Sequence, residues 1–113
     1  MFSIEQVDAR ELSTWLKGEK FLLVDVRTPG ETAYGIIPGA KLLPLHLLPL
    51  NVDKFKGQDK IVIYCQSGAR SAQACAFLSR QGIENTYNLG GGIMSWAGER
   101  LPVVTPDAES TLV

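Results

Sequence analysis

Two apolar runs constrain the fold of this chain more than any other feature of its sequence. Residues 21–26 are apolar at every position except Asp25, and residues 61–64 are apolar or aromatic throughout. Continuous runs of this length suit strands that are buried on both faces, as in a parallel sheet, better than strands with one face in water. The aspartate near the end of the first run is therefore conspicuous.

Helical patterns alternate with these runs. Asp8, with Glu11 three residues later, predicts a capped helix that ends at Gly18. In chain order, the pattern then predicts a short irregular helix over 47–55 interrupted near Pro49, a helix that ends at Gln81 with Gly82 as its cap, a strand over 86–89 and a helix over 93–100. Strands that alternate with helices predict an α/β fold, with a parallel sheet covered on both faces.

The totals favour one domain. The chain has 113 residues, of which 45% are hydrophobic, and this is enough for a single core without metal or disulfide. We expect a domain over residues 1–102 and a loosely attached C-terminal tail over 103–113, after Pro102.

The charges and the apolar runs exclude several classes of partner. With 11 basic and 12 acidic residues, no net field favours nucleic acid or an anionic membrane. No apolar run approaches the ~20 residues of a membrane span, and the first residues lack the pattern of a signal peptide. We therefore expect an unprocessed cytoplasmic protein that binds neither nucleic acid nor membranes.

The strongest chemical signal follows the second apolar run. Cys65 comes directly after it, in a short polar loop that contains Gly68, and a helix begins at once. The N-terminus of a helix offers unpaired N–H groups and about half a positive charge, which favour a thiolate and a bound anion. A buried structural thiol is the alternative, but a polar loop with a glycine is unsuited to a core. Cys65 is therefore the predicted nucleophile.

The second cysteine has the opposite interpretation. Cys75 lies at helical spacing from Leu78 and Ser79, which predicts packing in the core rather than a role as a resolving thiol. Because Cys65 and Cys75 lie ten residues apart, in a loop and the following helix, their Cα atoms are predicted to be too far apart for a disulfide. Two free thiols indicate a reducing compartment.

The charged residues near this loop have several interpretations. Gly68 lets the backbone turn so that successive N–H groups point inward and form an anion nest. Arg70 either points at a bound anion or stays outside and pairs with a carboxylate such as Asp25. Asp25 is predicted to support the loop as a structural acceptor, because beside the sulfur its charge would raise the pKa of the thiol.

No pattern in the sequence indicates a metal or a cofactor. His46 is the only histidine, and its segment favours a surface or packing role over that of a catalytic base. No cluster of Cys, His and carboxylate residues has ligand spacing, and Gly90-Gly91-Gly92 lacks the dinucleotide-binding pattern.

Four segments, in their order and spacing, resemble the signatures of the rhodanese domain over about residues 3 to 100. They are Asp25-Val26-Arg27, Gly35-Ile36-Ile37-Pro38-Gly39-Ala40, Cys65-Gln66-Ser67-Gly68-Ala69-Arg70-Ser71, and Leu89-Gly90-Gly91-Gly92 with Trp96. Two positions depart from the family: Ile36 stands where histidine is usual, and an aromatic residue is missing near Thr32. The resemblance implies a three-layer α/β domain whose central, mainly parallel sheet is flanked by helices.

The resemblance also implies a function. In single-domain rhodaneses, the matching cysteine takes sulfane sulfur from thiosulfate or a similar donor, holds it as a persulfide and passes it to an acceptor. Here that residue is Cys65, and the implied acceptors are cyanide, a low-molecular-weight thiol, thioredoxin or a sulfur-carrier protein. The substrate-binding loop comprises Gln66, Ser67, Gly68, Ala69, Arg70 and Ser71.

Two alternatives stay open. Certain phosphatases and arsenate reductases share the rhodanese fold, and the chain could also be a persulfide carrier or docking module for a protein partner. Four residues separate Cys65 from Arg70, whereas the related phosphatases have five. The shorter loop predicts a smaller ring of N–H groups that discriminates against phosphate esters and arsenate.

Overall fold

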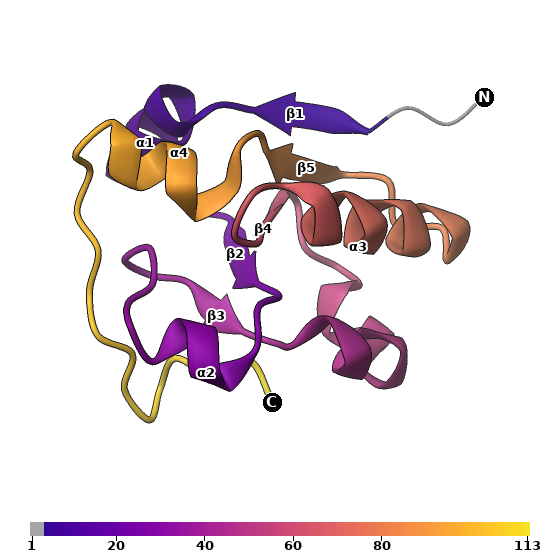
Figure 1. Ribbon diagram of the computed structural model, residues 1–113. Helices are drawn as coiled ribbons and strands as arrows, with labels where there is room; N and C mark the ends of the chain where they lie inside the picture. The colour runs from indigo at the N-terminus through magenta and orange to yellow at the C-terminus, as the bar shows by residue number, and fades with distance from the viewer. Residues whose placement is uncertain (1–3) are drawn as a thin grey trace.

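A five-stranded, all-parallel sheet forms the centre of the protein (Figure 1). The computed structural model describes residues 4–113. The strands are β1 (Glu5–Val7), β2 (Leu22–Asp25), β3 (Lys41–Leu42), β4 (Ile61–Tyr64) and β5 (Thr86–Leu89), and their order across the sheet is β1-β5-β4-β2-β3. The predicted parallel sheet is confirmed, and the two apolar runs form the neighbouring strands β2 and β4 near its middle.

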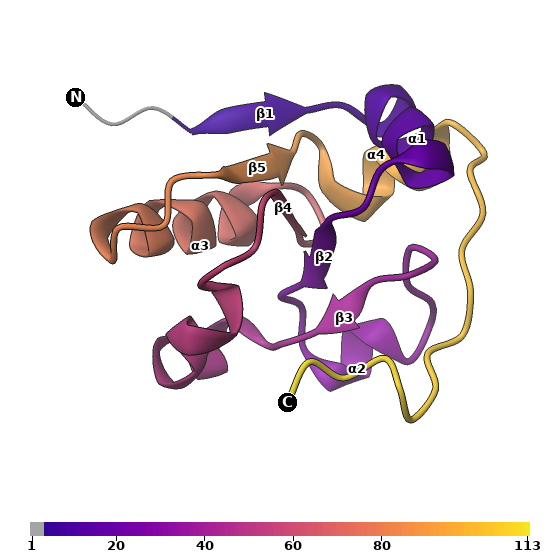
Figure 2. The same cartoon turned by 180° about the vertical axis from the view of Figure 1, so that it is seen from behind.

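Helices cover both faces of this sheet (Figures 1 and 2). They are α1 (Ala9–Gly18), α2 (Pro29–Thr32), the 3₁₀ segment η1 (Leu45–Phe55), α3 (Ala69–Arg80) and α4 (Gly92–Gly98). Successive strand residues face opposite sides: Leu23 packs in the cluster under α1 and α4, and Val24 packs in the cluster under α3 and η1. The domain therefore has three layers. Within residues 4–113, no helix combines the length and apolar character that a membrane crossing requires.

The ends of the helices follow the predicted signals. The Asp8 side chain accepts a hydrogen bond of 2.8 Å from the Glu11 N–H at the start of α1. Beyond α3, Gly82 adopts a φ of +85° and its N–H donates to the Ser79 carbonyl at 3.0 Å. The interruption of η1 lies at Asn51 rather than at Pro49. The Asn51 side-chain amide donates a hydrogen bond of 2.8 Å to the Leu47 carbonyl. In a regular α-helix, the backbone N–H of Asn51 would donate to this carbonyl instead.

Two short elements were not predicted. β1 presents the exposed polar residues Glu5 and Gln6 at the edge of the sheet, so its three residues carry no apolar run that marks a strand. α2 is a single helical turn, and it begins with a capping box between Thr28 and Glu31. Both elements are too short for hydrophobic periodicity to reveal.

The C-terminal segment, which is the yellow trace in Figure 1, is attached to the domain by hydrogen bonds at three places. Trp96 Nε1 donates to the Pro102 carbonyl at 2.7 Å, and Ile36 and Val104 exchange backbone hydrogen bonds of 2.8 and 2.9 Å. Further along, Leu42 in β3 donates to the Ser110 carbonyl at 2.7 Å. This attachment differs from the expected loose tail, because the edge strand β3 and the 36–41 turn leave backbone groups for the segment to pair with.

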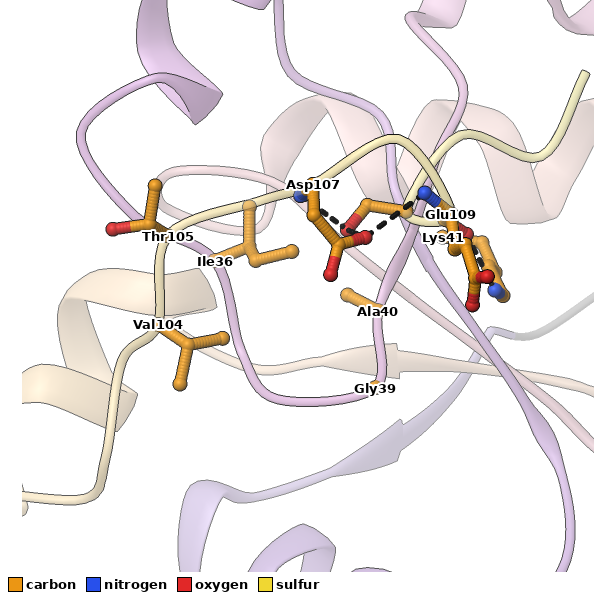
Figure 3. A pocket seen from close by; sticks show the side chains of 9 residues that line it. Ile36, Gly39, Ala40, Lys41, Val104, Thr105, Asp107 and Glu109 are labelled. Carbon is orange, nitrogen blue, oxygen red and sulfur yellow. Dashed lines mark hydrogen bonds between the residues drawn. The ribbon is translucent and has the colours of Figure 1, made fainter.

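Ile36, one of the two departures from the rhodanese pattern, therefore has a structural role. Its side chain is buried in the core and its backbone holds the C-terminal segment. The 36–41 turn and that segment enclose a hollow of about 230 Å³ (Figure 3). Lys41 Nζ donates to the Glu109 carbonyl there, and the Asp107 carboxylate accepts from the Glu109 N–H. Lys41 and Asp107 thus pair with groups of the hollow itself, and none of its lining residues belongs to the Cys65 loop.

Candidate active site

Cys65 lies at the carboxyl edge of the sheet, between the end of β4 and the start of α3. In this position the chain must turn from a buried strand into a helix within residues 65–68. Ligands of open parallel sheets bind at this edge, as we expected from the sequence. The Cys65 side chain is buried, with a residue exposure of 1%.

Hydrogen-bond donors from the loop surround the sulfur of Cys65. The Gly68 N–H lies 3.1 Å from Sγ, and the Ser71 N–H and Oγ each lie 3.4 Å from it. Gly68 reaches this position through a φ of +107°, in the left-handed region that favours glycine. The predicted ring of inward N–H groups is therefore present, with Gly68 as the residue that turns the backbone.

These donors determine the ionisation of the thiol. Burial disfavours the thiolate and acts to raise the pKa of Cys65. The hydrogen bonds from the Ser71 hydroxyl and from the N–H groups of Ser71, Gly68 and Ser67 outweigh burial, so the pKa lies below its ordinary value. The direction agrees with the sequence-based expectation of a stabilised thiolate.

The N-terminus of α4 fixes the backbone of the Cys65 loop through hydrogen bonds. The N–H groups of Ile93 and Met94 donate to the carbonyls of Cys65 and Gln66 at 2.9 and 3.1 Å. Gly92, with a φ of +60°, makes this approach possible. A Cβ atom at Gly92 would lie 2.5 Å from the Cys65 carbonyl oxygen and closer still to that of Gln66. The turn at these glycines therefore fixes the path of the loop.

Asn88 in β5 supports the loop from the neighbouring strand. It is buried, its Nδ2 donates to the Gly68 carbonyl at 3.2 Å, and its Oδ1 accepts from the Ser71 hydroxyl. Sequence reasoning treated Asn88 only as part of a strand. The sequence held a signal for this role, because a buried side-chain amide such as Asn88, between Tyr87 and Leu89, needs hydrogen-bond partners. The structure supplies them, since β5 ends beside the Cys65 loop.

Asp25 supports the loop indirectly, through Arg27. The fully buried Asp25 carboxylate accepts from the Arg27 N–H at 2.9 Å and from its guanidinium at 2.8 to 3.1 Å. Arg27 in turn donates to Gln66 Oε1 at 3.5 Å and to the Gly35 carbonyl at 2.7 Å. Burial opposes the charge on Arg27, but Asp25 reverses this effect and the pKa of Arg27 is raised. The intermediate role of Arg27 was not predicted.

Arg70 pairs with a carboxylate, which belongs to the second of the two predicted alternatives. The partner is Glu31 in α2 rather than Asp25, because Arg27 already occupies Asp25. Both terminal nitrogens of Arg70 donate to Glu31, each at 2.7 Å, and each side chain is about one-third exposed. Arg70 lowers the pKa of Glu31 to about 2.

The other singled-out residues lie away from this chemistry. Cys75 is buried in the core, where burial raises the pKa of its thiol, and both cysteines are free, as predicted. His46 is exposed on η1. In the part of the chain that the structure describes, no group of three or more His, Cys, Asp or Glu side chains is arranged to hold a metal ion.

The structure thus defines the protein as a three-layer α/β domain whose central strand β4 ends at a cysteine that lies among hydrogen-bond donors of the following loop. The chain belongs to the rhodanese-like domain family, whose model matches residues 8–99. The resemblance seen in the sequence is therefore confirmed.

Relatives and solved structures agree with this assignment. A sulfurtransferase from Allochromatium vinosum is 48% identical over 105 residues, which cover 92% of this chain and 98% of the relative. A rhodanese-like domain protein from Staphylococcus aureus has 33% identity and a TM-score of 0.82, with coverage of 92% and 100%. A Rhodopseudomonas palustris protein described as a possible tyrosine phosphatase has 26% identity and a TM-score of 0.84, with coverage of 89% and 85%.

Proposed function

We propose that the protein is a sulfurtransferase in which Cys65 carries sulfane sulfur, as a persulfide, from thiosulfate or a similar donor to a thiophilic acceptor. Membership of the rhodanese-like family and similarity to a sulfurtransferase support transfer of sulfur in general. The observation that carries the particular mechanism is the set of donors from Gly68 and Ser71 around the Cys65 sulfur.

The first half-reaction loads the cysteine. The Cys65 thiolate attacks the outer sulfur of thiosulfate and forms a new S–S bond, while the S–S bond of thiosulfate breaks and sulfite leaves with its electron pair. The negative charge then resides on the outer sulfur of the persulfide. N–H donors that are already in place stabilise this charge without reorganisation. Because Cys65 reacts as a thiolate, the step needs no general base, and the exposed His46 has no part in it.

The second half-reaction unloads the cysteine. A nucleophilic acceptor attacks the outer sulfur, the persulfide S–S bond breaks and the Cys65 thiolate leaves, stabilised again by the same donors. Cyanide, a low-molecular-weight thiol, thioredoxin and a sulfur-carrier protein all meet this chemical requirement. Transfer only to a protein partner would make the chain a persulfide carrier with the same intermediate. Both thiols are free, which agrees with a reducing, cytoplasmic setting.

A phosphatase is the second candidate, because the Rhodopseudomonas palustris structure bears that description. Two features argue against it. The loop has four residues between Cys65 and Arg70, one fewer than in the related phosphatases. Moreover, both terminal nitrogens of Arg70 donate to Glu31, so the guanidinium that would enclose a phosphate is already paired with a carboxylate.

Mass spectrometry of the intact protein tests the proposal. After incubation with thiosulfate we expect the mass of one added sulfur atom, located on the Cys65 peptide and removed by a thiol reductant. A sulfur atom on Cys75 would contradict the mechanism. Aryl-phosphate hydrolysis that depends on Cys65 and exceeds sulfur transfer in the same preparation would favour the phosphatase.

A further inference from the structure

Both arginines that approach the Cys65 loop are already paired with carboxylates. Arg27 reaches Gln66 but is bound to Asp25, and Arg70 lies in the loop itself but is bound to Glu31. The positive charge of each guanidinium is therefore largely offset by a carboxylate. Negative charge at the ring is favoured mainly by its N–H groups and the end of α3.

The Glu31 carboxylate is held firmly in this pairing. It accepts from both terminal nitrogens of Arg70 at 2.7 Å, and its Oε1 also accepts from the Thr28 N–H and hydroxyl at 3.0 and 3.1 Å. The Thr28 contacts form the capping box of α2, so the backbone of that helix fixes the position of the carboxylate. A glutamine at this position would keep the capping box and lose the charge.

Arg70 nevertheless remains within electrostatic reach of the reactive sulfur. It belongs to the first turn of α3, one residue before Ser71, whose N–H and hydroxyl face the sulfur. Glu31 is the main cause of the raised pKa of Arg70, and the negative charge of Cys65 adds to it. A guanidinium so placed, if released, is in range of an anion bound at the ring.

We infer that Glu31 is a specificity-determining residue: by binding Arg70 it lowers the affinity of the site for doubly charged sulfur donors relative to singly charged ones. The inference rests on the proposed sulfur transfer through Cys65. Thiosulfate carries two negative charges, and its sulfonate oxygens match the fork of a guanidinium. With Glu31 in place, those oxygens meet a guanidinium whose charge is already offset and a carboxylate of the same sign as the donor.

Methanethiosulfonate is the matched probe, because it has the same S–S bond with one charge fewer. The Cys65 thiolate attacks its terminal sulfur, the S–S bond breaks and methanesulfinate leaves with the electron pair. The protein product is the same persulfide that thiosulfate gives. The ratio of the two loading efficiencies, each a rate constant divided by the half-saturating concentration, isolates the effect of donor charge from the reactivity of Cys65.

In the Glu31→Gln variant we expect the loading efficiency with thiosulfate, relative to methanethiosulfonate, to rise about tenfold, the scale of one charge-assisted hydrogen bond. The gain should shrink as ionic strength increases. It should also vanish in the Glu31→Gln/Arg70→Gln double variant, because the released guanidinium is then absent. In Arg70→Gln alone, Glu31 is left unpaired and the ratio should fall below the wild-type value.

Glu99→Gln is the matched control. Glu99 caps the C-terminus of α4, whereas the N-terminus of α4 contacts the Cys65 loop, and Glu99 pairs with the exposed Arg10. Its substitution should therefore leave the ratio unchanged. Equal changes with both donors in Glu31→Gln would overturn the inference and assign the pair a purely structural role. Thermal denaturation would show whether Glu31→Gln unfolds. In that case, Arg70→Gln tests the inference, and a ratio of loading efficiencies equal to that of wild type would overturn it. Failure of wild type and all variants to take sulfur from either donor would reject the proposed function itself.

Discussion

The two cysteines of this chain share nearly the same burial but differ in ionisation. Cys65 has an exposure of 1% and Cys75 of 0%, and both pack in the cluster under α3 and η1. The pKa of Cys65 is nevertheless lowered, through donors from Ser71, Gly68 and Ser67 that overcome burial, whereas the pKa of Cys75 is raised by burial.

The contrast indicates that donor geometry rather than exposure sets the direction of a thiol pKa in this fold. Cys75 lies inside α3, where the backbone N–H groups are used by the helix itself. Cys65 lies before the same helix, where the N–H groups of the first turn have no partner within the helix and point at the sulfur. A shift of ten positions along the chain therefore changes the direction in which the pKa of a buried thiol moves.

Replacing each cysteine separately tests the contrast most strongly. Cys65→Ser should reduce sulfur transfer at least about a thousandfold, because a hydroxyl does not ionise near neutral pH. Cys75→Ala should retain most activity and lose about 1–2 kcal/mol of stability through the small cavity it leaves. Transfer assays and urea denaturation measure both effects. Retained activity in Cys65→Ser would remove the basis of the comparison.

Gly92→Ala should weaken the loop that distinguishes Cys65 from Cys75. The added methyl group would overlap the Cys65 and Gln66 carbonyls, and the positive φ adds backbone strain. We expect a loss of about 2–5 kcal/mol in unfolding free energy, together with slower alkylation of Cys65 in the folded fraction.

Gly98→Ala is the matched control in the same helix, since no atom lies within 4 Å of its added Cβ. It should leave unfolding and alkylation nearly unchanged. Equal stability losses in the two variants would mean that Gly92 does not hold the loop specifically.

Ser71→Ala should bring the reactivity of Cys65 closer to that of an ordinary thiol. The variant removes the hydroxyl donor to Sγ but keeps the backbone N–H, so the pKa should rise while remaining influenced by the loop. Alkylation of Cys65 at pH 7 should slow by about 3- to 10-fold, the scale of one hydrogen bond to a charged group. The midpoint of alkylation rate against pH measures the change. A midpoint unchanged from wild type would show that the hydroxyl does not stabilise the thiolate.

The smallest expected effect is on stability at alkaline pH. Because the pKa of Cys75 is raised in the folded state, the unfolded chain ionises first, and Cys75 should cost about 1 kcal/mol of stability between pH 7.5 and 9.5. Cys65 has a lowered pKa, so its contribution is full above the unfolded pKa and is lost as pH falls through the folded one. Relative to wild type, Cys75→Ala should therefore gain stability as pH rises and Cys65→Ala should lose it. Parallel pH profiles for the two variants would contradict the assigned directions.

The sequence allowed prediction of those parts of the site that depend on local order along the chain. Cys65 and Gly68 could be identified because a buried strand, a polar loop and a helix start follow one another directly. Asp25 stood out because a charge in an apolar run needs a buried partner.

The missed residues depend on contacts between distant segments. Glu31, Asn88 and Gly92 meet the loop from α2, β5 and α4, and the sequence did not show which atoms of the loop they would contact. Arg70 pairs with Glu31 rather than with Asp25 because Arg27 already forms an ion pair with Asp25. Such competition between partners becomes visible only in three dimensions.

The attachment of the loop to α4 has a consequence during synthesis. A ribosome releases Cys65 before Ile93 and Met94, whose N–H groups fix the Cys65 and Gln66 carbonyls. One edge of β4 likewise stays unpaired until β5 has been synthesised and pairs with it. We therefore expect the loop around Cys65 to reach its final conformation in the nascent chain only after the segment through α4 has emerged and packed.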